Sequence, residues 1–154
     1  MNIEAITKTI KLIERMPAER MYMRDFATGD THVSATCETA ACVGGWAVAA
    51  NPPIHFYSYQ QAMLESFQVT GHIAGSIIYM FDVSGNKKTF ENLVRTVVPN
   101  VNTNNSILSI FDELPAEMRK RAMIIMLQEL VVTGEVDWLG AVANAISEVR
   151  QATE

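Results

Sequence analysis

The sequence predicts a mainly α-helical protein, a compact single-domain bundle of about seven or eight short helices with a central helix near residues 39–50. Apolar residues recur every three or four positions in most segments, which is the spacing of one helix face. Serine, threonine or aspartate precedes several of these segments, as helix N-caps do. No two segments alternate strongly enough to pair as strands, and the 154 residues are a natural length for one domain, residues 1–154.

The N-terminal segment is expected to form an amphipathic helix over residues 3–15, because isoleucines recur on one face and lysines lie mostly away from it. Pro17 ends this helix. Residues 21–26 alternate weakly, which is typical of a short extended segment, and residues 27–36 are small and polar, as in a loop. The isoleucines of the predicted face are Ile3, Ile6, Ile10 and Ile13.

The central helix is expected over residues 38–50, with the Thr39 hydroxyl as its N-cap and the prolines at 52–53 as its stop. The glycine pair at 44–45 costs about 1–2 kcal/mol in a helix interior. We expect the close approach of another backbone to offset that cost, because this is the usual reason for glycine inside a helix.

Six further helices are expected, each from its apolar spacing and a start or stop signal. They are residues 58–67 with Ser58 as N-cap, residues 72–81 after Thr70, residues 90–98 after Thr89, residues 106–113, residues 115–133 ended by Gly134, and residues 138–151 capped by Asp137. Gly71 and Gly75, four residues apart, predict close helix packing within the domain. The C-terminal helices, residues 106–151, either share the core or form a docking arm.

Charge and composition exclude several classes of function. The chain has a formal net charge of −5 and a pI of about 5.2, which argues against binding to nucleic acid or to anionic membranes. No apolar run approaches the roughly 18 residues that span a bilayer. The N-terminus lacks the basic start and apolar run of a secretion signal. We therefore expect a cytoplasmic protein with reduced thiols and no membrane partner.

Reactive side chains are concentrated in one part of the chain. Residues 25–86 contain no lysine or arginine, yet they hold both cysteines, all three histidines and Trp46. Any functional site is therefore expected to draw on this segment.

One interpretation of this segment is a reactive thiol. Cys42, in the first turn of the central helix, would meet free N–H groups and the positive end of the helix dipole, which favour a thiolate. With His55 as a neighbouring base, Cys42 would be the nucleophile of a thiol-dependent hydrolase or transferase. Sequence spacing alone places no histidine or acid beside it.

Two further interpretations use the second cysteine. A zinc site would combine His32, Cys37, Cys42 and His55, whose side chains are ligands that zinc prefers, and would make the chain a metal-stapled interaction module. Its spacing lacks the usual C-x-x-C pairs. A disulfide or redox pair between Cys37 and Cys42 would close a small loop, although a reducing cytoplasm disfavours a permanent bond.

The interpretation that we adopt is packing. Cys42 and Trp46 are four residues apart and so share a face of the central helix, with Cys37 packed beside them. Free cysteine is among the most buried residue types. On this interpretation the segment holds no catalytic residue, metal or cofactor, and the histidines make local hydrogen bonds.

The stretch at residues 37–47 resembles a family of small, mostly uncharacterised bacterial and phage proteins that share the motif C-G-T-x-x-C-x-x-G-[HW]-A. The chain departs from this motif at Glu38, where the family usually has glycine. A looser resemblance covers residues 15–98 and says little about the C-terminal helices. The residues singled out by the motif and its glycine pair are Cys37, Thr39, Cys42, Gly44, Gly45 and Trp46.

The resemblance implies a small intracellular protein that is encoded by a phage or mobile element and acts in the cytoplasm of a bacterial host. Such proteins commonly bind host machinery and include inhibitors of bacterial defence. Our first hypothesis is therefore a non-enzymatic protein that binds and inhibits or modulates a host protein by surface contact. The net charge of −5 would suit a partner with a basic surface, such as one that holds nucleic acid.

Overall fold

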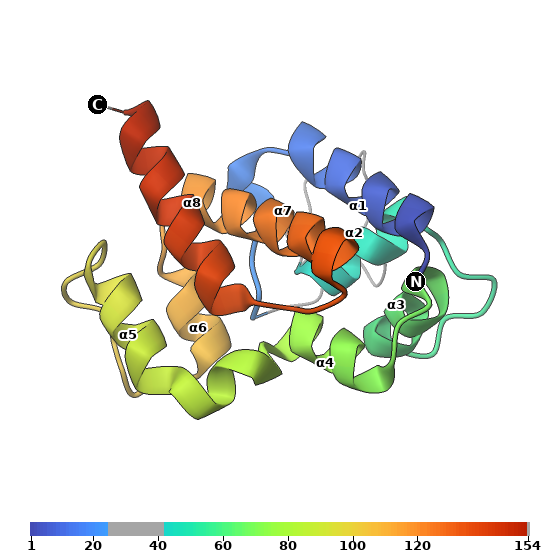
Figure 1. The fold of residues 1–154 in the computed structure, drawn as a ribbon, viewed down its shortest axis with the longest axis horizontal. Coiled ribbons are helices and arrows are strands. Elements are labelled where there is room, and N and C mark those ends of the chain that lie inside the picture. The colour runs from blue at the N-terminus through green and yellow to red at the C-terminus, as the bar shows by residue number, and fades with distance from the viewer. Residues whose placement is uncertain (25–41, 154) are drawn as a thin grey trace.

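The computed structural model describes residues 1–24 and 42–153, and these residues form helices without a strand (Figure 1). The prediction of a mainly α-helical fold is therefore confirmed. In chain order the helices are α1 (Ile3–Arg15), η1 (Ala18–Arg20), α2 (Val43–Ala50), α3 (Tyr59–Phe67), α4 (Gly71–Tyr79), η2 (Phe81–Asn86), α5 (Lys87–Arg95), α6 (Ile107–Asp112), α7 (Ala116–Thr133) and α8 (Trp138–Ala152), where η denotes a 3₁₀ helix.

Helix α7 is the longest of these helices, at 18 residues, and it runs through the middle of the structure. It packs against α8 on one side and against α1 on the other (Figure 1). Helix α2 packs against α1, α3 and α4, and α5 packs against α6. Helices α1 and α2 are thus neighbours in space, although residues 16–42 separate them from each other along the chain.

Helix α1 begins as the sequence predicts, because the side chain of Asn2 accepts a hydrogen bond from the Ala5 N–H at 3.1 Å. Its buried face is centred on Thr9, whose hydroxyl donates to the Ala5 carbonyl at 3.0 Å. Ile3 lies at the edge of this face and is 52% exposed, whereas the other three isoleucines of the predicted face are buried. The predicted buried face was therefore correct at three of its four isoleucines and wrong at Ile3.

The central helix α2 is shorter than predicted. Cys42 occupies the N-cap position with an extended backbone (φ −80°, ψ 178°), and the helix begins at Val43. The prediction of a helix from Glu38 was therefore wrong for α2, and Thr39, its predicted N-cap, lies outside the described residues. Six consecutive residues of α2, 43–48, are buried, which agrees with a central position in the fold.

The close approach at Gly44 involves side chains and not a second backbone. A methyl group added at Gly44 would lie 3.3 Å from the Ile78 side chain of α4 and 3.4 Å from the Tyr59 Cβ of α3. Of the other predicted pair, Gly75 is the tightly packed member, because an added Cβ would lie 2.5 Å from the Phe81 ring. Gly71 has no neighbour closer than 3.8 Å to such a Cβ.

Several predicted helix ends are confirmed. Three predicted N-cap side chains accept a hydrogen bond from the backbone N–H three residues later, and these are Ser58, Thr70 and Asp137. Gly134 ends α7 in the left-handed conformation, with a φ of 75° that glycine adopts at little cost.

Helix α5 differs from its prediction at both ends. It runs from Lys87 to Arg95, so Thr89 is its third residue and not its cap. The chain is already helical in η2 when it reaches Lys87, and no side-chain cap starts α5. The predicted turn at 84–88 is thus part of a continuous helical path.

One cluster of buried hydrophobic side chains extends from α1 to α8. Trp138 at the start of α8 is fully buried in it and donates its indole N–H to the Ser76 carbonyl at 2.9 Å. Its ring lies edge-on to that of Phe111 in α6, with the centroids 5.5 Å apart. Helices α6 to α8 therefore contribute to the common core, which excludes the alternative of a separate docking arm for them.

The predicted extended segment at 21–26 is described up to Arg24. Met21 has extended dihedral angles (φ −95°, ψ 112°), and both Met21 and Met23 are buried. The carboxylate of Asp112 accepts hydrogen bonds from the Met23 N–H at 2.6 Å and from the Arg24 N–H at 2.9 Å. This segment is therefore held against the end of α6.

A buried guanidinium holds the same segment against α7. Arg119 is only 6% exposed, and it donates to the carbonyls of Met21 at 2.6 Å, Leu114 at 2.5 Å and Asp112 at 3.3 Å. The guanidinium also lies 4.6 Å from the centroid of the Tyr22 ring. A buried charge is tolerated only when its donors are satisfied, and here backbone carbonyls satisfy them.

We expect Arg119→Met to lower the free energy of unfolding by about 3 kcal/mol, because it leaves buried carbonyls without a donor. Arg121→Met is the matched control on the same helix, since Arg121 is 38% exposed and pairs with the exposed Glu148. The control should cost less than about 1 kcal/mol. Urea unfolding followed by circular dichroism measures both, and equal losses in the two variants would contradict the assigned role of Arg119.

Candidate functional site

The candidate site lies where α2 ends and the chain turns away from the core. Asn51 follows α2, and its side-chain amide donates to the Ala5 carbonyl at 3.1 Å and to the Thr9 hydroxyl at 3.3 Å. The same amide lies 3.3 Å from the Ala47 carbonyl of α2. Asn51 therefore joins the C-terminal end of α2 to the buried face of α1.

A prominent loop follows this joint. The prolines at 52–53 lack a backbone N–H and stop the helix. Beyond them, the side chains of Ile54 and Tyr57 are 95% and 78% exposed. Phe56 is 36% exposed and packs edge-on against Tyr59, with the ring centroids 4.9 Å apart. Single exposed apolar residues are ordinary, but neighbouring ones on one loop mark a contact surface.

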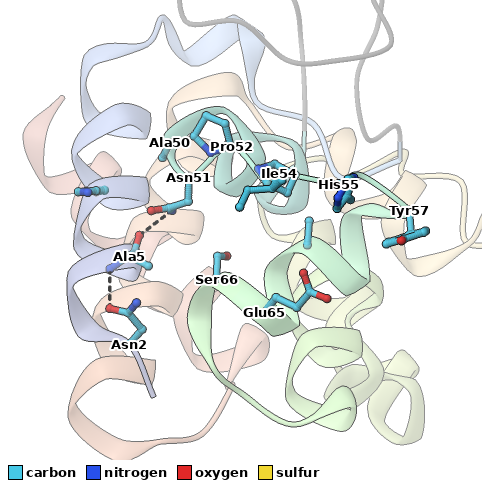
Figure 2. A pocket seen from close by; sticks show the side chains of 13 residues that line it. Asn2, Ala5, Ala50, Asn51, Pro52, Ile54, His55, Tyr57, Glu65 and Ser66 are labelled. Atoms are coloured by element: carbon cyan, nitrogen blue, oxygen red, sulfur yellow. Dashed lines mark hydrogen bonds between the residues drawn. The ribbon is translucent and has the colours of Figure 1, made fainter.

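This loop borders a pocket of about 540 Å³ between α1, the end of α2 and α3 (Figure 2). Figure 2 shows Asn2 and Asn51 on one wall, Glu65 and Ser66 facing them from α3, and the loop residues Ile54, His55 and Tyr57 along the rim. The volume is within the range of small-ligand and side-chain sites. The pocket thus combines an apolar rim with polar walls.

Cys42, the predicted reactive cysteine, does not line this pocket and is not in a state that favours reaction. Cys42 is fully buried as a free thiol, and burial raises its pKa to about 11 from an ordinary value of 9.0. Hydrogen bonds from the N–H groups of Gly45 and Gly44 lower the pKa by less than burial raises it. The predicted effect of the helix start is therefore present but outweighed, and the thiol stays protonated at neutral pH.

The structure does not pair the predicted thiol with the predicted base. Cys42 precedes α2 and is fully buried, whereas His55 follows α2 along the chain and is exposed on the loop. His55 is not among the groups that shift the pKa of Cys42.

The predicted zinc site is only partly described. His32 and Cys37 lie outside the described residues, and so does the predicted contact of Cys37 with Cys42. Within residues 1–24 and 42–153, no three histidine, cysteine or acidic side chains form a group that could hold a metal ion. Of the two described members of the predicted set, Cys42 is fully buried and His55 is exposed.

The described motif residues are packing residues. Trp46 is fully buried, and the guanidinium of Arg20 lies 5.0 Å from the centroid of its ring. Its indole N–H is buried, and no hydrogen-bond acceptor for it is present in the described part of the chain. Gly44 and Gly45 are buried on the same short helix. These contacts agree with the packing interpretation of the motif.

A half-buried carboxylate at Asp82 was not predicted from the sequence. One oxygen of Asp82 accepts a hydrogen bond from the Trp138 N–H at 2.8 Å, and the other is buried without a partner among the described residues. Burial raises the pKa of Asp82, and the nearby charge of Asp137 raises it further. The Trp138 N–H and the nearby His72 act in the opposite direction. No local pattern indicates this role, because it depends on a contact between η2 and α8.

Comparisons of the chain with protein-family models, curated proteins and solved structures find no match. Among the described residues, no helix has both the length and the apolar character needed to cross a membrane. The site is therefore interpreted from its own geometry. Its candidate residues are the loop at 52–57 and the pocket walls. The sequence marks the loop only by an apolar and aromatic run after two prolines, and no sequence signal indicated the pocket walls.

We expect iodoacetamide to modify Cys42 in the native protein at least about 100-fold more slowly than in urea at the same pH, because burial both raises the thiol pKa and blocks access. Mass spectrometry of the peptides separates this modification from that of Cys37. Rapid native modification at Cys42 would contradict the packing role and restore the thiol-enzyme hypothesis.

We expect the stability of the protein to rise as the pH falls through the folded-state pKa of Asp82. A carboxyl whose pKa is raised by folding binds its proton more tightly in the folded state, so ionisation above that pKa destabilises the fold. Asp82→Asn should therefore gain stability relative to the wild type between pH 4 and pH 7, as measured by thermal unfolding. Glu135→Gln, an exposed position before α8, is the control, and the same gain there would refute the assignment to Asp82.

Proposed function

We propose that this protein is a non-enzymatic binding protein that docks onto another protein through the loop at 52–57 and the adjoining pocket. One observation carries this proposal. Ile54 and Tyr57 expose 95% and 78% of their side chains at the rim of a pocket of about 540 Å³. Covering apolar surface is favourable by about 25 cal/mol per Å², so a partner that covers these two side chains gains binding energy.

The loop is also fixed at both ends, which favours tight binding. The Asn51 amide holds its start to α1, and Ser58 accepts the Gln61 N–H at 3.0 Å as the cap of α3 at its end. The prolines at 52–53 restrict the backbone between these points. A preformed loop loses little conformational entropy when it binds. Aromatic side chains in such positions often dominate the energy of an interface.

The chemistry of Cys42 does not favour the thiol-enzyme hypothesis. A buried thiol with a raised pKa is a poor nucleophile, and the neighbouring residues of the motif pack in the core. The proposal therefore assigns the motif to the stability of α2 and the function to the surface at the other end of this helix. It requires no cofactor.

The resemblance of residues 37–47 to small phage proteins makes a bacterial host protein, including a component of host defence, the partner that we propose. Binding would inhibit or modulate that protein by covering its surface in the cytoplasm. The net charge of −5 would favour a partner that is basic overall, such as one that binds nucleic acid, because opposite net charges speed the first encounter.

The proposal predicts that Ile54→Ser combined with Tyr57→Ser lowers the recovery of the bound host protein at least about tenfold in affinity capture from a bacterial lysate. Quantitative mass spectrometry identifies the captured proteins. Val132→Ser is the matched control, since Val132 is an 84% exposed apolar side chain on α7. It should leave capture unchanged.

Both substitutions in the loop replace exposed side chains, so thermal unfolding should shift little and loss of capture cannot be ascribed to unfolding. Equal capture by the wild type and the double variant would refute the assignment of the binding surface to the loop. The absence of any protein that depends on the wild-type loop would refute the proposed function.

A further inference from the structure

A second hollow continues the pocket along the seam between α1 and α2. It has a volume of about 480 Å³ and shares Lys8 and Ala50 with the first pocket. Its remaining walls come from Lys11, Leu12 and Arg15 of α1 and from Ala49 of α2. The two hollows adjoin each other at Lys8 and Ala50, and we call them together the α1–α2 groove, which the loop bearing Ile54 borders at one end.

The second hollow is lined by cations. Lys8, Lys11 and Arg15 follow one another at intervals of three and four residues, so they lie along one edge of α1. Lys8 forms an exposed pair with Glu4 at 3.5 Å. Within the described part of the chain, no ion pair involves Lys11 or Arg15. Two of the three cations thus have their charge available to a ligand.

The groove does not neutralise this charge. The carboxylates beside it are Glu4, which pairs with Lys8, and Glu65 in the wall of the first pocket. The C-terminal ends of α1 and α2 each add only about half a unit of negative charge. The stretch 25–86 supplies no lysine or arginine, so α1 provides all the cations of the groove. The chain as a whole has a net charge of −5, so the groove is locally opposite in sign to the whole chain.

We propose that the α1–α2 groove binds an acidic peptide segment of the partner, with an apolar side chain beside Ile54 and carboxylates beside Lys11 and Arg15. This inference deepens the proposed function and rests on it, because the docking loop forms one end of the groove. The net charge of the chain acts only weakly at long range, since screening sets in within about 8 Å at physiological salt. The cations of the groove act only on groups in contact with them, so they determine which peptide segment of the partner binds there.

The spacing of the cations defines the segment more closely. Lys11 and Arg15 are four residues apart, which is about 6 Å along a helix axis. In an extended peptide, alternate residues are separated by about 6.6 Å and point to the same side. Two carboxylates at alternate positions therefore match the two cations. The apolar anchor precedes the first carboxylate by about four residues, because Lys8 lies between the rim of the pocket and Lys11 and because an even spacing points the anchor to the same side of the peptide as the carboxylates.

A peptide is favoured over a nucleic acid as the occupant. Glu4 pairs with Lys8 at one side of the groove and Glu65 lines the pocket wall, so a chain of phosphates would pass two carboxylates. The net charge of −5 adds a weak repulsion of a polyanion, which salt screens. An acidic peptide with an apolar residue places its carboxylates only where the cations are.

The test is fluorescence anisotropy with labelled decapeptides of serine and glycine. The acidic probe carries one tryptophan and, about four and six positions later, two glutamates, and the matched probe carries glutamines at those positions. We expect the acidic probe to bind the wild-type protein at least about tenfold more tightly than the glutamine probe, with the difference reduced by added salt. Equal affinities, or no binding of the acidic probe up to about 1 mM, would overturn the inference.

Charge reversal identifies the residues. Lys11→Glu combined with Arg15→Glu should lower the affinity for the acidic probe at least about tenfold. The same variant should raise the affinity for a probe with lysines in place of the glutamates. Lys88→Glu combined with Arg95→Glu, on the exposed surface of α5, is the matched control and should leave both affinities unchanged. Tighter binding of a thymidine oligonucleotide than of the acidic probe would assign the groove to nucleic acid and overturn the inference.

The two proposals fail separately. If the partner is captured equally by the wild type and the Lys11→Glu, Arg15→Glu variant, the groove inference is overturned while the loop proposal stands. If the Ile54→Ser, Tyr57→Ser variant still captures the partner but the charge-reversed variant does not, the docking role of the loop is refuted and so is the apolar anchor beside Ile54. The carboxylate contacts with Lys11 and Arg15 are then the part of the groove inference that is supported.

Discussion

The buried guanidinium of Arg119 is the interaction on which the arrangement of the N-terminal half depends. A charge in the interior is costly unless its donors are satisfied, and Arg119 meets this condition by binding the carbonyls of Met21 and Leu114. The next residue, Lys120, donates to the carbonyls of Glu14 at 2.9 Å and Met16 at 2.8 Å, at the C-terminal end of α1. Two successive cations of α7 therefore fix the point at which the chain leaves α1.

This constraint reaches the candidate site through α1. Once α1 is held on α7, the Asn51 amide connects α2 to it through the Ala5 carbonyl and the Thr9 hydroxyl. The loop at 52–57 then starts from a fixed point, and the groove between α1 and α2 acquires its basic edge. The proposed contact surface is thus a consequence of how α1 is anchored, and its residues come from segments about 40 positions apart in the sequence.

The fate of Cys42 illustrates how burial decides between two chemical interpretations of one residue. The N–H groups at the start of α2 favour a thiolate, as expected for a cysteine in this position. Desolvation acts in the opposite direction and is larger, so the thiol is protonated. The glycine at 44 is explained by the same packing, since the Ile78 side chain and the Tyr59 Cβ leave no room for a larger residue without displacement. The described part of the motif therefore supports the core, and the exposed chemistry lies at the other end of α2.

The sequence by itself determined the fold class and many of the helix ends. Helix ends are set by backbone groups within three or four residues of Thr70, Asp137 and Gly134. Such local hydrogen bonds and dihedral preferences can be predicted from the sequence alone. The start of α5 was not predictable in this way, because η2 runs directly into it and removes the need for a cap.

Only the tertiary structure decided which side chains are buried and which distant segments meet. Arg119 and Asp82 carry charges that a sequence places on the surface by default, yet both are enclosed by elements far away along the chain. The loop could be recognised as apolar from its residues, whereas its pocket and the basic edge beside it required α1, α2 and α3 to come together. The physical reason is that burial and electrostatic environment are set by contacts between residues remote in sequence, and local pattern carries no information about them.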